Sequence, residues 1–200
     1  LLGEDCDRRF MANVMGMVND YETVKKVADD FGLVYTPFHG CGYKLVPEAL
    51  TRLGIKHLYC EPKQMVIDGD FPTVVSPNPE NPEGFYLAID LAKEKNVDFI
   101  LGTDPDSDRI GAAVRDGERF VLISGNQMGA LLTHFIVTAR SAALSPAATL
   151  VKTIVTGELG ADIARAHGVQ VEETLTGFKY IGEKISAYET DPAHDFLMGY

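Results

Sequence analysis

Three aspartates at alternate positions follow a short apolar run and are closed by an arginine, in the order Asp104, Asp106, Asp108, Arg109. Carboxylates this close repel one another, and a divalent cation bound by oxygen ligands is the simplest way to offset that repulsion. In a straight strand the outer two aspartates would lie about 13 Å apart, at roughly 3.3 Å per residue, which is too far for one small cation. The chain must therefore curl here, and Pro105 favours the bend because it fixes one φ angle.

The rest of the chain alternates between strand-like and helix-like segments. The predicted strands are 32–36, 56–60, 98–103, 111–115, 119–123, 150–156, 169–175 and 196–200, and the predicted helices are 1–30, 45–53, 84–95, 125–139, 158–167 and 178–188. This alternation favours helices packed on a largely parallel sheet. Open sheets of this class place ligand sites after the carboxyl ends of their strands, where the aspartates lie. Asp116-Gly117 predicts a hairpin, so the first sheet is expected to be mixed.

The two halves of the chain echo each other. Val34-Tyr35-Thr36, a glycine-containing loop, a helix and a strand recur as Val151-Lys152-Thr153 with the same succession. We therefore expect two tandem, related α/β domains with mixed, largely parallel sheets flanked by helices, covering residues 1–123 and 124–200. A long proline-rich connection, residues 61–83, is expected to pack one domain on another, because loops of this length are usually functional or interface segments.

Composition excludes several classes of protein. The formal net charge of −11 argues against a nucleic-acid partner, whose phosphates demand a basic surface, although local basic residues can still bind an anionic small molecule. No apolar run approaches the roughly 18 residues that span a bilayer. Three cysteines without a CxxC pair favour reduced thiols and a cytoplasmic protein. The missing initiator methionine and the apolar run at 196–200 lead us to expect a fragment of a longer chain.

The aspartate loop has three competing interpretations before any wider comparison. It could be a solvated acidic turn. A helix–loop–helix calcium site would need a glycine and a glutamate where this chain has Arg109 and Arg115. A haloacid-dehalogenase-like phosphotransferase carries Asp-x-Asp-x-Thr/Val after an apolar strand, and here Asp108 stands in place of the threonine or valine.

The full string Thr-Asp-Pro-Asp-Ser-Asp-Arg at 103–109 resembles the metal-binding loop of the α-D-phosphohexomutase family, the phosphoglucomutases and phosphomannomutases. Four more segments are similar to this family in consistent order: 71–80, 124–132, 151–156 and 174–184. The resemblance covers nearly the whole chain. It implies the second domain and most of the third domain of such an enzyme.

The resemblance implies roles for the charged residues of the first domain. Asp104, Asp106 and Asp108 would hold Mg²⁺ together with a phosphate oxygen on an active-site serine, which suits the preference of Mg²⁺ for carboxylate and phosphate ligands. Arg109 would clamp phosphate or substrate, where positioning and electrostatics supply most of the catalysis. The alternative is a surface arginine that balances the aspartates.

In the second domain the resemblance implies that Lys152 assists proton transfer with the sugar hydroxyls. Desolvation lowers the affinity of a lysine for its proton, which would fit acid–base work; the alternative is a strand-edge lysine that reaches water. The loop Thr176, Gly177, Phe178 and Lys179 would bind the phosphate of the substrate, because a helix start and a lysine both attract anions. The alternative there is an ordinary helix start. His39 is expected to be structural.

We therefore expect part of a phosphosugar mutase that moves a phosphoryl group between positions 1 and 6 (or 5) of a hexose (or pentose) phosphate, through a phosphoserine and a bisphosphate. Phosphoglucomutase, acting on glucose 1-phosphate and glucose 6-phosphate, is the leading expectation. The resemblance implies that the serine segment belongs to a missing first domain and that the loop that reads the sugar follows directly after Tyr200. The partners would thus include missing domains of the same chain, and the 200 residues alone are expected to be inactive. The alternatives are an aspartyl-nucleophile phosphatase and a non-catalytic cation-binding α/β module.

Overall fold

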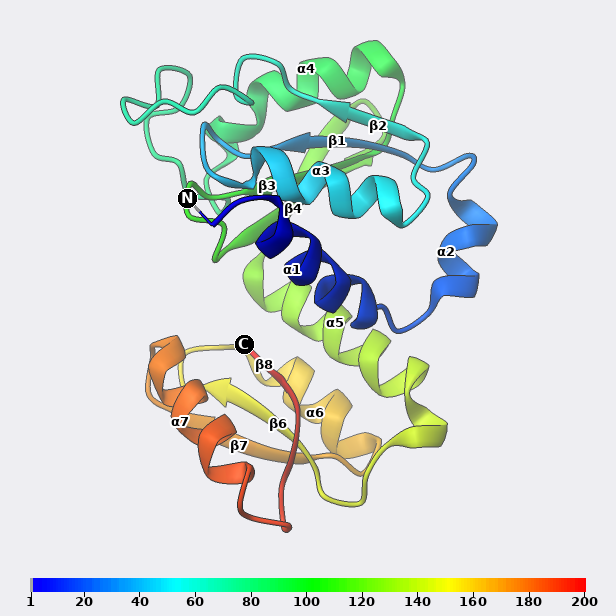
Figure 1. Cartoon of the computed structure of the whole chain (residues 1–200), viewed down its shortest axis with the longest axis vertical. Helices are drawn as coiled ribbons and strands as arrows, with labels where there is room; N and C mark the ends of the chain where they lie inside the picture. Colours follow the sequence, from blue (N-terminus) through cyan, green and yellow to red (C-terminus); the bar gives the residue numbers. More distant parts are fainter. Residues whose placement is uncertain (1) are drawn as a thin grey trace. The chain divides into compact units, whose positions relative to one another are not determined.

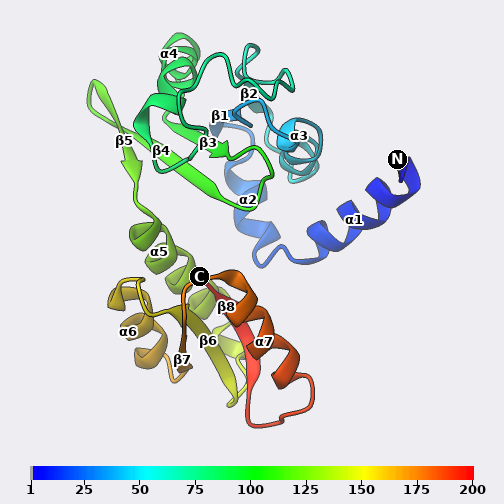
Figure 2. The same ribbon diagram turned by 90° about the vertical axis from the view of Figure 1, so that its left-hand side faces the viewer.

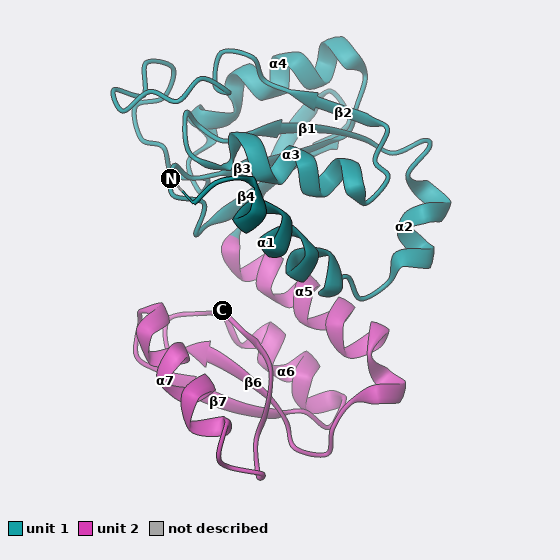
Figure 3. Ribbon diagram, viewed as in Figure 1, with its two compact units in different colours: residues 1–124 teal, residues 125–200 magenta. Residues whose placement is uncertain are grey.

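The computed structural model describes residues 2–200 and divides into two compact units, 1–124 and 125–200 (Figure 3). The division lies one residue beyond the boundary expected at 123/124. Each unit has its own sheet and its own core. None of the helices in the described residues is both long and apolar enough to cross a membrane.

Unit 1 contains a mixed five-stranded sheet in the order β2-β1-β3-β4-β5. The strands are β1 (Gly32–Thr36), β2 (His57–Cys60), β3 (Phe99–Thr103), β4 (Ile110–Asp116) and β5 (Arg119–Ile123). The first three are parallel, and β4 and β5 add to β3 as antiparallel strands. The expectation of a mixed first sheet is confirmed.

Two crossover helices of unit 1 lie on opposite faces of its parallel strands. Helix α3 (Gly42–Arg52) joins β1 to β2, and α4 (Tyr86–Lys95), preceded by the 3₁₀ turn η1 (Pro82–Phe85), joins β2 to β3 (Figures 1 and 2). Because the third strand adds on the other side of β1, right-handed connections place the two helices on different faces. Helices α1 (Glu4–Gly16) and α2 (Tyr21–Val27) precede the sheet, and α1 packs against α3.

The core of unit 1 lies directly beneath the strand that leads to the aspartates. The rings of Phe38 and Phe85 are fully buried and meet edge to face, with centroids 5.2 Å apart. Gly102 on β3 leaves room for these rings, since a Cβ atom there would lie 2.8 Å from Phe85 and 3.1 Å from Phe38. Gly102, two residues before Asp104 on β3, therefore packs on the rings of Phe38 and Phe85.

Unit 2 contains a three-stranded, wholly parallel sheet in the order β7-β6-β8. The strands are β6 (Ala148–Thr153), β7 (Gln170–Thr174) and β8 (Asp195–Gly199). Helix α7 (Phe178–Tyr188) covers one face of this sheet. Helix α6 (Glu158–Ala166) covers the other face (Figures 1 and 2).

Helix α5 (Gly125–Ala139) packs against α6 and is followed by the short 3₁₀ turn η2 (Ser141–Ala143). Two glycines allow the helices to hold one aromatic ring. A Cβ atom on Gly129 would lie 2.6 Å from the ring of Tyr200, and one on Gly160 would lie 2.0 Å from its hydroxyl oxygen. The Tyr200 ring thus ties the end of the sheet to both helices.

The two sheets are wound in the same order. In each unit the first strand is central, the second lies on one side of it and the third on the other. The repeated segments Val34-Tyr35-Thr36 and Val151-Lys152-Thr153 both lie on these central strands, β1 and β6. The expectation of two related α/β sheets flanked by helices is confirmed, with the second sheet purely parallel in the described residues.

Several details differ from the sequence-based expectations. The single helix expected at 1–30 is two helices, because the Asp20 side chain accepts a hydrogen bond from the Thr23 N–H (2.9 Å) and begins α2 afresh. The helix expected at 45–53 begins at Gly42. The hairpin turn is Gly117-Glu118, with Asp116 paired to Arg119 and with Gly117 at a φ of 62°.

The strand expected at 150–156 is also too long. Strand β6 ends at Thr153, where the Thr156 N–H donates to the Thr153 carbonyl oxygen (3.1 Å) and closes a turn. The β-branched side chains of Ile154 and Val155 are exposed. Strand propensity describes fit to a half-buried pleated surface, and these two residues lie beyond that surface.

We expect Gly102→Ala to destabilise unit 1 by about 1–3 kcal/mol, the usual cost of overpacking a rigid core. Gly182→Ala in α7 is the matched control, since a Cβ atom there meets no atom within 4 Å and alanine favours a helix by about 0.5–1 kcal/mol. Urea unfolding of both variants measures the difference. Equal midpoints for the two would contradict the described packing of Phe38 and Phe85.

Candidate functional site

The aspartate loop begins where β3 ends and doubles back on itself. The Ser107 N–H donates to the Asp104 carbonyl oxygen (3.0 Å), and Ser107 has a φ of 61°, so the chain turns sharply between them. As a result Asp104, Asp106 and Asp108 each offer a carboxylate oxygen within 4.8 Å of the others. Asp104 is buried, and Asp106 and Asp108 are exposed.

Arg109 organises this loop from its other end. The two oxygens of the Asp104 carboxylate accept separate hydrogen bonds, one from the Arg109 N–H (2.9 Å) and one from its Nε–H (2.8 Å). The same Nε lies 3.5 Å from the Asp108 carboxylate. The arginine side chain remains 56% exposed, so one part of it holds the loop while another part faces solvent.

The pKa values of two aspartates in the loop are shifted in opposite directions. Burial acts to raise the pKa of Asp104, but the hydrogen bonds and the positive charge of Arg109 outweigh it and lower the pKa. The pKa of Asp108 is raised, first by its hydrogen bond to Asp104 and then by burial and the negative charges of Asp106 and Asp104. A proton at Asp108 relieves the repulsion, and a cation shared by the three carboxylates would relieve more of it.

The donor set fits a small divalent cation. All the candidate ligand atoms are carboxylate oxygens, which hard cations prefer, and they lie within 4.8 Å of one another. A bound cation would be able to take water or a phosphate oxygen as its other ligands. Arg115, which occupies the position of the glutamate in a calcium-binding loop, pairs instead with Asp98 on the strand side.

The loop after β1 supports the aspartate loop from behind. The Cys41 N–H donates to the Pro105 carbonyl oxygen (2.8 Å), and a Cβ atom on Gly40 would lie 2.2 Å from the Pro105 Cα. The hydroxyls of Tyr35 and Thr103 share a buried hydrogen bond of 2.8 Å beside this contact. Only glycine at position 40 lets the two backbones approach so closely.

His39 is buried and has a structural role, as expected. Its Nδ1–H donates to the Val66 carbonyl oxygen (2.9 Å), because a carbonyl can only accept, and its Nε2 bonds the Thr73 hydroxyl (2.9 Å). Gln64 donates to the same hydroxyl (3.1 Å) and accepts from Thr36 (2.6 Å). These bonds tie the proline-rich connection to the loop after β1 within unit 1.

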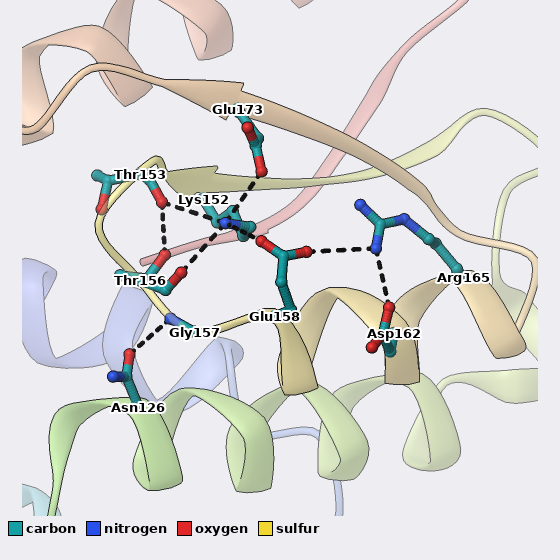
Figure 4. Close-up of polar contacts among 9 residues, drawn as sticks. All are labelled: Asn126, Lys152, Thr153, Thr156, Gly157, Glu158, Asp162, Arg165 and Glu173. Atoms are coloured by element: carbon teal, nitrogen blue, oxygen red, sulfur yellow. Dashed lines mark hydrogen bonds and ion pairs between the residues drawn. The ribbon is translucent and has the colours of Figure 1, made fainter.

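Lys152 lies in the middle of unit 2, on the central strand β6, with a side chain only 1% exposed. Its Nζ lies 2.8 Å from a Glu158 oxygen and 3.1 Å from a Glu173 oxygen (Figure 4). Desolvation acts to lower the pKa of Lys152, but the hydrogen bonds and charges of the two glutamates outweigh it and raise the pKa. The alternative of a strand-edge lysine is wrong, because Lys152 lies on the central strand and its side chain is buried.

The loop at 176–179 precedes helix α7. Gly177 is the N-cap with a φ of 126° and offers no side chain to the first N–H groups of the helix. Thr176, Phe178 and Lys179 are exposed, and the Lys179 Nζ lies 4.8 Å from the centre of the Tyr180 ring. Backbone N–H groups without a side-chain cap and a lysine at one helix start can bind an anion.

The residues expected from sequence thus form two groups, one in each unit. Asp104, Asp106, Asp108 and Arg109 are brought together after β3. In unit 2, Lys152 and the loop at 176–179 lie at the same carboxyl edge, because Thr153 on β6 pairs with Thr174 on β7. Glu158 and Glu173 were not expected from the sequence, although a lysine in an apolar strand signals that acidic partners must lie close to it.

Comparison with known proteins identifies the family. Residues 8–117 match the family model for domain II of phosphoglucomutase/phosphomannomutase, an alpha/beta/alpha domain, and residues 124–199 match the model for domain III. This chain belongs to the phosphoglucomutase/phosphomannomutase family. The family is in general metal-dependent, and the three aspartates are the candidate metal site of this member.

Some relatives of this chain are named phosphomannomutase and others phosphoglucomutase. A probable phosphomannomutase of Haemophilus influenzae is 39% identical over 160 residues, which is 80% of this chain and 32% of the relative. A phosphoglucomutase of Staphylococcus epidermidis is 36% identical over 172 residues, 86% of this chain and 31% of the relative. The chain therefore spans about a third of the length of these relatives.

Solved structures of the family share the fold. A phosphoglucomutase/phosphomannomutase family protein of Burkholderia thailandensis has a TM-score of 0.64 at 22% identity, over 85% of this chain and 36% of that one. The parafusin phosphoglucomutase of Paramecium has a TM-score of 0.65 at 17% identity, over 90% of this chain and 31% of that one. At these identities the likeness supports the arrangement of strands and helices only.

We expect the wild-type chain to bind divalent cations weakly, and Asp106→Asn to weaken that binding at least about tenfold, because even outer-sphere partners of a metal contribute 10–100-fold. Asp106 is exposed, so the change should leave the fold intact. Asp116→Asn in the hairpin is the matched control. Mn²⁺ titration followed by electron paramagnetic resonance measures the affinities, and equal affinities for both variants would exclude the aspartate loop as the site.

Proposed function

We propose that this chain forms the metal-binding part and one phosphate-binding part of a phosphosugar mutase. The reaction would move a phosphoryl group between positions 1 and 6 (or 5) of a hexose (or pentose) phosphate, through a phosphoserine and a bisphosphate intermediate. The observation that carries the proposal is the convergence of three carboxylate oxygens within 4.8 Å, beside Arg109, in a member of this family.

We propose Mg²⁺ as the cation, held by Asp104, Asp106 and Asp108. When bound, it would stabilise negative charge on a transferring phosphoryl group. Mg²⁺ suits a site with a few carboxylates and open positions, because it retains water or takes phosphate oxygens as its other ligands.

Arg109 and the loop at 176–179 would bind phosphate groups of the substrate. The Arg109 guanidinium is fixed by the Asp104 carboxylate and is 56% exposed, so its solvent-facing N–H groups can donate to phosphate oxygens without a large loss of side-chain entropy. Thr176, Gly177, Phe178 and Lys179 would supply backbone N–H groups and a cation at the start of α7. Both roles require binding and orientation, which is most of what phosphoryl transfer needs from a protein.

We propose glucose 1-phosphate and glucose 6-phosphate as the substrate pair, with the mannose phosphates as the second candidate because relatives carry both names. We also propose a cytoplasmic protein, in keeping with three free cysteines in the described structure. Since the chain spans about a third of its relatives, we propose that turnover requires further domains and that these 200 residues alone are inactive.

The geometry disfavours an aspartyl phosphatase. Asp104, the residue that would be the nucleophile, is fully buried, and both of its oxygens are bonded to Arg109. A beryllium fluoride adduct at Asp104 would reverse this assignment. The other alternative, a cation-binding module without catalysis, has no feature in its favour beyond the carboxylates themselves.

We expect a longer protein that contains this chain and its flanking domains to convert glucose 1-phosphate to glucose 6-phosphate. Asp106→Asn should reduce kcat/KM by about 10²-fold or more, the usual cost of losing one preorganised electrostatic group, and Asp116→Asn should leave it unchanged. A dehydrogenase-coupled assay follows the product. Turnover by the 200-residue chain alone, or full activity of Asp106→Asn, would contradict the proposal.

A further inference from the structure

The ammonium group of Lys152 is enclosed by oxygen atoms. Besides Glu158 and Glu173, the Thr156 carbonyl oxygen lies 3.2 Å and the Thr153 carbonyl oxygen 3.4 Å from Nζ (Figure 4). These acceptors, all within residues 2–200, outnumber the N–H donors of an ammonium group. Each N–H therefore has an oxygen partner although the side chain is buried.

The two carboxylates come from different elements and are themselves held in place. Glu173 is the register partner of Lys152 on the neighbouring parallel strand β7. Glu158 is the first residue of α6, where the helix dipole favours a negative charge, and its other oxygen lies 3.4 Å from Arg165, which also binds Asp162 at 2.9 Å. The pKa of Glu158 is lowered, first by its hydrogen bond to Lys152.

The turn that supplies the two carbonyl oxygens is held by hydrogen bonds that do not involve Lys152. The Thr156 hydroxyl donates to the Thr153 carbonyl oxygen (2.7 Å), and the Gly157 N–H donates to the Asn126 side chain on α5 (2.8 Å). The turn cannot swing away from Nζ without breaking these bonds. The other titratable group with an electrostatic effect here is Tyr200, whose pKa is raised by burial while the charge of Lys152 opposes the rise.

We propose that Glu158 and Glu173 are positioning residues that hold Lys152 as an immobile, protonated ammonium group. A neutral lysine would leave both carboxylates, which lie 2.8 Å and 3.1 Å from Nζ, without their counter-charge, and opposite charges this close favour the charged form of a lysine. The assignment of a charged state rests on geometry alone. Its catalytic meaning rests on the proposed mutase function: Lys152 would serve as a fixed positive charge or a proton donor, and another group would have to accept the proton of the sugar hydroxyl.

The test uses the 200-residue chain and needs no turnover, so it is independent of the proposed function. In NMR spectra of lysine ammonium groups at neutral pH, Lys152 should give a slowly exchanging N–H signal, identified by its loss in Lys152→Met. Glu173→Gln should speed that exchange at least about tenfold and lower the titration midpoint of the Lys152 Cε resonance by about one pH unit or more. Glu94→Gln, which removes the partner of the exposed Lys95, is the matched control and should change neither value for Lys152.

Glu158→Gln provides the same test if Glu173→Gln does not fold, because the Glu158 side chain is 57% exposed. A further measurement uses the unaltered chain. Reductive dimethylation needs a neutral, accessible amine, so Lys152 should react at least about tenfold more slowly than the exposed Lys63. A Lys152 titration midpoint below that of Lys63, unchanged exchange in both glutamate variants, or labelling of Lys152 as fast as Lys63 would overturn the proposal.

Discussion

The repulsion among three carboxylates is the constraint on which unit 1 depends. Asp104 is buried, and Arg109 neutralises it with a backbone N–H and a guanidinium N–H from only five positions along the chain. Much of the surrounding structure keeps the loop in this shape: Gly40 admits the Pro105 backbone, and Gly102 admits the aromatic pair below it. The loop is therefore built to carry excess negative charge at a fixed place, which is the requirement for a cation site in a protein of this family.

Unit 2 instead contains a buried positive charge, that of Lys152 on the central strand of its sheet. The Lys152 side chain is only 1% exposed, so its charge must be balanced by groups of the fold. The balance uses one residue from the adjacent strand and one from the first turn of the following helix, Glu173 and Glu158. Arg165 and Asn126 hold the outer layer of this arrangement. The Lys152 ammonium group is thus held by partners on a strand, a helix and a turn of the same unit.

Most of the fold could be predicted from the sequence because the signals are local. Apolar runs bounded by glycine located the strands, and helices 125–139 and 178–188 match α5 and α7 as predicted. The aspartate cluster was also visible, since its residues are close in sequence. What the sequence could not show depends on register and burial. The pairing of Lys152 with Glu173 follows from strand alignment, and the early end of β6 follows from the exposure of Ile154 and Val155.

The central strands β1 and β6 hold different side chains at matching positions of the repeated segments. Tyr35 on β1 and Lys152 on β6 occupy matching positions in the repeated pattern, and each is a buried polar group near the carboxyl end of its strand. Tyr35 shares a neutral hydrogen bond with Thr103 just before the aspartates, whereas Lys152 anchors a cluster of charges. The same strand position thus carries a neutral hydrogen bond in unit 1 and a pair of ion pairs in unit 2. The residue at this position therefore differs between the two units, while the order of the strands around the central strand is the same.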